Sequence, residues 1–121
     1  MPYLTVTYTS SVKFPKTMPA FLADMNRAFS ECESVKLANI KSSAMPIVNY
    51  CVAGSEKEGE YVDMNIRVLP GRSKTLRAYM IDHMLGFLKR TLFPVNRGLT
   101  LHVSVQLEEL NEYQCDIQLA D

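Results

Sequence analysis

The chain has 121 residues, and its 13 Lys plus Arg balance its 13 Asp plus Glu, so the formal net charge is zero. This length suits one domain with a buried core, which we assign to residues 1–121. Charge neutrality argues against nucleic acid or an anionic membrane as a partner held by bulk electrostatics. No apolar run is long enough to span a bilayer, and the alternating start MPYLTVTY is unlike a signal peptide. We therefore expect a soluble, cytoplasmic protein.

The cysteines give no indication of a metal site. Cys32, Cys51 and Cys115 are far apart, and the sequence contains no CxxC motif or Cys/His cluster. Metal sites built from these residue types normally show short, regular spacings. We expect three reduced, partly buried thiols.

The first half of the chain predicts a strand, a helix and two more strands. Residues 3–8 alternate between apolar and polar positions, which is the period of a strand with one buried face. Thr17 is suited to cap a helix whose apolar positions recur at helical spacing: Phe21, Leu22, Met25, Ala28 and Phe29. Candidate strands follow at residues 37–41 and 45–52. The polar, glycine-bounded segment 54–60 predicts a loop.

The second half repeats this scheme. Residues 61–68 alternate, and Pro70 and Gly71 end the strand. Ser73 is suited to cap a helix that runs to about Leu92, with the apolar positions Leu76, Met80, Met84, Phe87 and Leu88. The strongest alternation follows at residues 99–107, and residues 112–119 alternate again.

Strand, helix, strand thus occurs twice, in pseudo-repeats at about residues 1–53 and 61–121. A crossover through a helix returns the second strand parallel to the first. We predict an α+β fold with a four-stranded mixed sheet, two helices on one face and a few short extra strands. Apolar residues occur on strands of both halves, so we expect the uncovered face to be apolar enough to require an oligomer. The terminal segment pairs either with a neighbour's sheet edge or within its own chain.

Four segments of the sequence resemble the tautomerase superfamily, and most closely the 5-carboxymethyl-2-hydroxymuconate isomerase family. These segments are MPYLTVTY, LANIKSS, DMNIRVLPGRSKTLR and LHVSVQLEEL, and they follow one another along nearly the whole chain. The Gly-Arg-Ser junction also resembles that of the shorter 4-oxalocrotonate tautomerase. The resemblance implies a homotrimer with inward-facing sheets. It also implies cofactor-free keto–enol isomerisation of small unsaturated 2-hydroxy or 2-oxo acids, as in the degradation of aromatic compounds.

Pro2 is the candidate general base, through the amine that removal of Met1 would expose. Moving a double bond in an enol acid requires taking a proton at one atom and returning it at another. An N-terminal amine titrates closer to neutral pH than a lysine, and burial beside apolar residues lowers its pKa further. A pKa near the working pH suits general acid–base catalysis. The alternative is a proline that merely precedes a strand.

Arg72 and Lys41 are the candidate substrate-binding residues. Arg72 lies at a strand-to-helix turn, where a guanidinium and a helix N-terminus both favour a carboxylate. Family resemblance suggests that it serves a site completed by a neighbouring subunit. Lys41 stands where the family usually has arginine, so it keeps the charge but lacks the planar fork. Surface roles for both residues remain alternatives, and two histidines, His83 and His102, are weaker candidates.

Two other functions remain open beside isomerisation. One is different chemistry with the same proline, such as hydration of an activated double bond. The other is a non-catalytic trimeric binding protein that retains the fold. Lys41 in place of arginine favours these two, whereas Pro2 and Arg72 favour the isomerase.

Overall fold

The computed structural model describes residues 1–55 and 58–120, and their regular elements are strands, two long helices and two short 3-10 helices. In chain order the elements are β1 (Tyr3–Thr9), α1 (Met18–Ser30), η1 (Leu37–Asn39), β2 (Lys41–Ile47), β3 (Glu60–Val68), α2 (Lys74–Leu92), η2 (Phe93–Val95) and β4 (Leu101–Glu109). No helix in the described part of the chain is long and apolar enough to cross a membrane.

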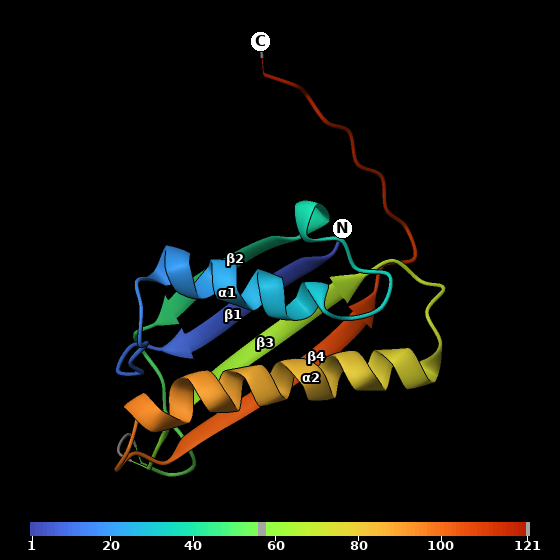
Figure 1. Ribbon diagram of the computed structural model, residues 1–121. Coiled ribbons are helices and arrows are strands. Elements are labelled where there is room, and N and C mark those ends of the chain that lie inside the picture. The colour runs from blue at the N-terminus through green and yellow to red at the C-terminus, as the bar shows by residue number, and fades with distance from the viewer. Residues whose placement is uncertain (56–57, 121) are drawn as a thin grey trace.

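The sheet confirms the predicted α+β fold. Its strand order is β2-β1-β3-β4, with β1 parallel to β2, β3 parallel to β4, and β1 antiparallel to β3 in the centre. Helix α1 connects the first parallel pair and α2 the second, and both helices cover the same face (Figure 1). The two halves of the chain are therefore two β-α-β units joined edge to edge.

Both helices begin at the residues that the sequence predicts. The Thr17 hydroxyl accepts a hydrogen bond from the Ala20 backbone nitrogen at 3.4 Å, and the Ser73 hydroxyl accepts one from that of Leu76 at 3.1 Å. Each cap satisfies a backbone donor that has no partner within the first turn of its helix. The cap of α2 fixes the turn that precedes it, which forms part of the candidate site.

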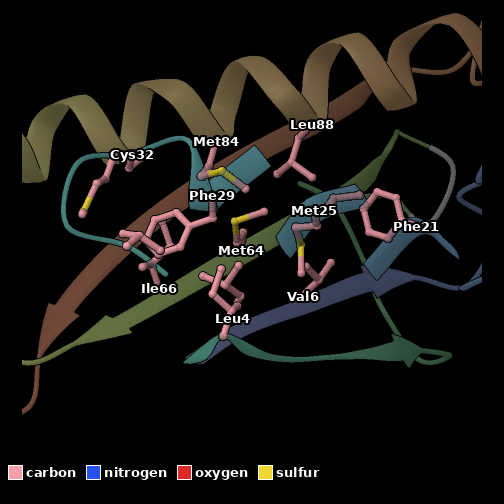
Figure 2. Close-up of a cluster of buried hydrophobic side chains, with 14 of the residues drawn as sticks. Leu4, Val6, Phe21, Met25, Phe29, Cys32, Met64, Ile66, Met84 and Leu88 are labelled. Carbon is pink, nitrogen blue, oxygen red and sulfur yellow. The ribbon is translucent and has the colours of Figure 1, made fainter. Parts of the chain in front are cut away.

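The hydrophobic core lies between the helices and the covered face of the sheet (Figure 2). Leu4 and Val6 of β1 lie opposite Ile66 and Met64 of β3 in the antiparallel register. The helices contribute fully buried side chains that pack over them: Phe21, Met25, Phe29, Met80, Met84, Leu88 and Leu92. Burial of each such side chain contributes about 1.5–3 kcal/mol to the stability of the fold. The chain's own helices therefore bury this apolar face.

The expectation that the uncovered face is apolar is wrong. The alternating Leu, Val, Ile and Met side chains of the central strands point towards the helices, because the covered face is the one that excludes water. The open face is mainly polar and carries, on β1, β3 and β4, Tyr3, Thr5, Thr7, Tyr61, Asp63, Asn65, Arg67, His102, Ser104, Gln106 and Glu108. Burial of this face is therefore not what would require a partner.

The prediction of two strands, at residues 37–41 and 45–52, is wrong in their number and bounds. Leu37–Asn39 forms a 3-10 helix, and a single strand, Lys41–Ile47, follows it. Pro46 lies inside this strand, which is possible because β2 is an edge strand and needs no hydrogen-bond donor on its outer side. Of the predicted loop 54–60, residues 56–57 lie outside the described residues, and Glu60 already belongs to β3.

The C-terminal half of the second unit differs in two details. The last strand is Leu101–Glu109, two residues later than the predicted 99–107. Residues 112–120 form no strand, so the alternative of a locally paired terminal strand is wrong for the described chain. This tail projects away from the sheet near the N-terminus (Figure 1), with Ile117 and Leu119 78% and 77% exposed.

Candidate active site

Pro2 and Arg72 line the same small cavity at one end of the sheet. Pro2 directly precedes β1, and the antiparallel register brings this end of β1 to the end of β3. The cavity has a volume of about 60 Å³ and is lined by Met1, Pro2, Val68, Leu69 and Arg72. Pro2 is buried and Met1 is half-buried. Two of the three candidate residues thus meet within a single chain.

The turn between β3 and α2 determines where Arg72 lies. Gly71 has φ +120°, a conformation that glycine adopts without the steric cost that a side chain would meet. The Arg72 side chain donates a hydrogen bond from Nη1 to the Leu69 carbonyl oxygen at 3.3 Å. Its Nε is buried and has no hydrogen-bond partner among the described residues. This nitrogen is therefore a donor to which no acceptor is provided by residues 1–55 and 58–120.

Arg77 stabilises the same turn from the first turns of α2. Its Nη1 donates to the Arg72 carbonyl oxygen at 2.6 Å and lies 3.9 Å from a carboxylate oxygen of Glu109. The turn is in this way connected to the end of β4. We regard Arg77 as a positioning residue, because it acts on the backbone of Arg72.

Lys41 lies beside Pro2 at the start of β2. Its backbone nitrogen donates a hydrogen bond to the Pro2 carbonyl oxygen at 3.1 Å, and its register partner on β1 is Tyr3. The side chain is exposed, and Nζ lies 5.5 Å from the centre of the Tyr3 ring, within the range of a cation–π contact. The structure therefore brings Lys41 to the same end of the sheet as Pro2 and Arg72.

Arg67 is a further cation at this end, and the sequence analysis did not identify it as a candidate. Its guanidinium carbon lies 4.9 Å from the centre of the Tyr3 ring, and its Nε is buried without a hydrogen-bond partner among the described residues. Lys41, Tyr3 and Arg67 form one row across three strands of the open face. Its place on the polar side of residues 61–68 was a signal, but only the strand register reveals this row.

Burial and a nearby cation both act on the amine at this end of the chain. Burial, and then the positive charge of Lys41, lower the pKa of the Met1 amine below its usual value.

The tail also reaches this region, since the hydroxyl groups of Tyr113 and Tyr3 lie 3.3 Å apart. Hydrogen bonds with Tyr3 and Cys115 raise the pKa of Tyr113 above its usual range. The Tyr113 hydroxyl therefore stays protonated at neutral pH.

The two histidines lie away from this end. His83 on α2 has Nε2 3.0 Å from the Ala28 carbonyl oxygen and 3.0 Å from a Glu31 carboxylate oxygen, so it connects the two helices. His102 is exposed on the open face, beside Tyr61 at the opposite end of β3.

Cys32 is buried, whereas Cys51 and Cys115 are exposed, which corrects the expectation of three partly buried thiols. No three His, Cys, Asp or Glu side chains of the described chain are grouped to hold a metal ion.

The mixed four-stranded sheet with two helices on one face is a fold that this chain shares with solved 5-carboxymethyl-2-hydroxymuconate isomerases. More specifically, the chain matches the 5-carboxymethyl-2-hydroxymuconate isomerase family over residues 2–117, and it belongs to that family. The protein is therefore an isomerase.

Solved structures show the same fold at low sequence identity. A 5-carboxymethyl-2-hydroxymuconate isomerase from Deinococcus radiodurans R1 is 19% identical with a TM-score of 0.82, covering 96% of this chain and 90% of that one. A 5-carboxymethyl-2-hydroxymuconate delta-isomerase is 16% identical with a TM-score of 0.81, covering 98% and 89%. A fused 4-OT wild-type symmetric trimer is 18% identical with a TM-score of 0.72, covering 95% and 90%. None of the curated protein sequences compared with the chain gives a significant match.

Proposed function

We propose that this isomerase moves a proton on a small unsaturated 2-hydroxy or 2-oxo carboxylic acid, with the Pro2 amine as general base and without a cofactor. The observation that carries the proposal is the cavity shared by Pro2 and Arg72, with Lys41 hydrogen-bonded to the Pro2 backbone. A base and two cations at one end of the sheet suit an anionic substrate that exchanges a proton.

The proposed base requires the removal of Met1. In the full chain the Pro2 nitrogen is part of an amide bond and is not basic, and the half-buried Met1 occupies one wall of the cavity. Without Met1 the nitrogen becomes a secondary amine, and the cavity gains the space that Met1 filled. The surroundings that lower the pKa of the Met1 amine, burial and Lys41, would act on the Pro2 amine as well. A pKa lowered in this way suits the Pro2 amine to general acid–base catalysis.

The cations would orient the substrate through its carboxylates. Arg72 offers a buried Nε that has no partner in the described part of the chain. Arg72 also lies one residue before the cap of α2, where the helix N-terminus favours negative charge. Lys41 and Arg67, on either side of Tyr3, add positive charge where the substrate would extend towards the open face. A cavity of about 60 Å³ accommodates a carboxylate, and the remainder of the substrate would lie outside it.

The proposed reaction conserves all atoms of the substrate. The Pro2 nitrogen takes the proton of the enol hydroxyl, the oxygen forms a carbonyl group, and the double bond shifts along the carbon chain of the substrate. The protonated Pro2 then returns a proton to the carbon at the other end of the shifted system. The nitrogen ends in its starting state, so each cycle needs no further reactant.

We also propose that the protein is a homotrimer. The exposed apolar side chains Met45 and Val48, near the edge strand β2, and Ile117 and Leu119, in the tail, support this proposal, since an isolated chain leaves them in water. A similar fold in a symmetric trimer adds to it. A tail that begins at the candidate site and then leaves the chain's own fold is suited to contact a neighbour (Figure 1).

A spectroscopic assay on 2-hydroxymuconate-type acids tests the proposed function. Conversion of the conjugated enol should be fast with the untagged protein and reduced by at least about tenfold in Pro2→Ala, which replaces the secondary amine. If no enol acid is converted by the untagged protein, the non-catalytic binding protein becomes the better account. If water is added to the double bond instead, the hydration alternative does.

A further inference from the structure

A second cavity lies at the opposite end of the sheet from Pro2. Val68, the last residue of β3, lines the Pro2 cavity, whereas Glu60, the first residue of β3, lines this one. The second cavity has a volume of about 390 Å³, which is within the size range of small-molecule sites. Its lining includes Ser11, Tyr50, Glu58, Glu60, Leu99 and Thr100.

Glu60 is the chemically unusual residue of this cavity. Glu60 is only 6% exposed, and it lies on the face of β3 that otherwise carries core residues. The Tyr50 hydroxyl donates a hydrogen bond to Glu60 Oε1 at 2.9 Å, whereas Oε2 is buried and has no partner among the described residues. A buried carboxylate oxygen without a donor is costly, so the site favours a ligand that supplies one.

The surroundings of Glu60 hold its carboxylate in place. The Tyr50 hydroxyl also lies 3.3 Å from the hydroxyl oxygen of Ser11, and the Glu60 backbone nitrogen donates to the Thr100 carbonyl oxygen at 2.9 Å. Gly59 allows this close approach, because a Cβ there would lie 3.0 Å from the same carbonyl oxygen. The carboxylate is thus positioned before any ligand binds.

We propose that this cavity binds a small organic amine, whose ammonium group pairs with the carboxylate of Glu60. The exposed Glu58 offers a second carboxylate to a second ammonium group, and Leu99, which is 47% exposed, offers an apolar wall to a short aliphatic chain. A metal ion fits less well, since a hard cation needs several oxygen ligands and the described chain has no suitable group of three acidic, His or Cys residues here. The site is independent of the chemistry at Pro2.

Titration of the ¹⁵N,¹³C-labelled full protein with three probes tests the proposal by NMR. n-Butylamine should change the chemical shifts of the Gly59 and Thr100 backbone amides and of the Glu60 carboxyl carbon, because its ammonium group contacts that carboxylate. 1,4-Diaminobutane should bind more tightly than n-butylamine, since it also reaches Glu58. 1-Butanol has the same aliphatic chain without the charge and should leave the Glu60 carboxyl carbon unchanged. If the two amines leave that carbon unchanged as well, or if 1-butanol shifts it equally, the proposal is overturned.

Variants assign the effect to the carboxylates. Glu60→Gln should weaken the binding of n-butylamine by at least about tenfold, because a charge-assisted hydrogen bond is lost. Glu58→Gln should weaken only the binding of 1,4-diaminobutane. Glu112→Gln, a substitution in the exposed tail, should change the affinity for neither amine. Unchanged affinity in a folded Glu60→Gln would overturn the proposal. If that variant does not fold, the Glu60 carboxyl signal of the wild-type protein decides.

Discussion

The backbone nitrogen of Lys41 donates a hydrogen bond to the carbonyl oxygen of Pro2 at 3.1 Å. The bond continues the parallel pairing of β1 and β2 by one residue, to the start of the chain. It depends on the backbone alone, so a substitution at position 41 that preserves the strand retains it. The charge of the Lys41 side chain can therefore be changed while Pro2 stays in place.

Lys41→Ala should move the rising limb of the pH profile of kcat/KM to higher pH. Burial is the largest cause that lowers the pKa of the N-terminal amine, and the charge of Lys41 is the next. The base must be unprotonated, so activity increases as the pH rises through the pKa of Pro2. Without the Lys41 charge this pKa is higher, although burial still holds it below the usual value. Initial rates across the pH range measure the shift.

The matched control for this prediction is Lys41→Arg. Arginine keeps the charge, so the limb should stay in place, and KM should remain similar or improve because the guanidinium can hold a carboxylate in two bonds. If Lys41→Arg moved the limb as far as Lys41→Ala, the effect of Lys41 on the amine would not be electrostatic.

Arg72→Ala should lower kcat/KM by about tenfold to a hundredfold on a 2-hydroxymuconate-type acid. A charge-assisted hydrogen bond contributes about 1.5–3 kcal/mol, which corresponds to this factor. Arg97→Ala removes an exposed arginine outside the Pro2 cavity and is the control. Equal kinetics in the two variants, with both folded by circular dichroism, would show that the carboxylate does not bind at Arg72.

The sequence predicts the helices and the central strands well because each depends on local signals. Thr17 and Ser73 are caps that can be read directly, and the apolar spacing between Phe21 and Phe29 has one simple interpretation as a helix. The β2 region has no such signal, since Leu37 begins a 3-10 helix that the residue pattern does not distinguish from a strand. Alternation places the apolar side chains of the central strands on one face, and the helices cover that face, so a second apolar face was not to be expected.

The site was predicted from the sequence only in part, for a similar reason. Pro2 and Arg72 are candidates because the segments that contain them resemble a known family, and their roles stay predictions. Arg67 is not, because its position beside Tyr3 depends on the register between β1 and β3, which joins residues far apart in the chain. The cavity around Glu60 was missed because the segment 54–60 was expected to be a loop. In the structure Glu60 begins β3 and points to the covered face.

Cys32 should react far more slowly with iodoacetamide than Cys51. Burial, and then the charge of Glu31, raise the pKa of the Cys32 thiol from its usual 9.0 to about 11. At pH 8 its reactive thiolate is therefore about a hundredfold scarcer than that of a thiol with a pKa of 9.0, and Cys32 is only 3% exposed. Mass spectrometry of timed samples measures the two rates. Equal rates in the folded protein would contradict the burial of Cys32.

The same thiol should make stability depend on pH at the alkaline end. The unfolded chain ionises its Cys32 near the usual value of 9.0, whereas the folded chain does so near 11. The stabilisation is therefore complete below pH 9 and is lost as the pH rises towards 11. Cys32→Ser, whose hydroxyl does not ionise in this range, should lack this component of the pH dependence in denaturant titrations.

Removal of residues 112–121 should weaken the proposed trimer. Ile117 and Leu119 are exposed in the chain by itself, and their burial in a neighbour would stabilise the assembly by about 1.5–3 kcal/mol each. Light scattering should report three subunits for the full chain. On dilution, the shortened chain should dissociate at a higher protein concentration than the full chain does. A full chain that remains monomeric or dimeric at working concentration would contradict the proposed assembly.

The most direct test of the proposed mechanism is to compare kcat/KM for two forms of the chain that differ only in front of Pro2. One form has lost Met1, as verified by intact mass, and the other carries one additional residue before Pro2. General acid–base catalysis contributes about a hundredfold to ten-thousandfold, so blocking the amine should lower kcat/KM by at least about a hundredfold while the trimer remains intact. Equal kcat/KM in the two forms would show that the Pro2 nitrogen is not the base.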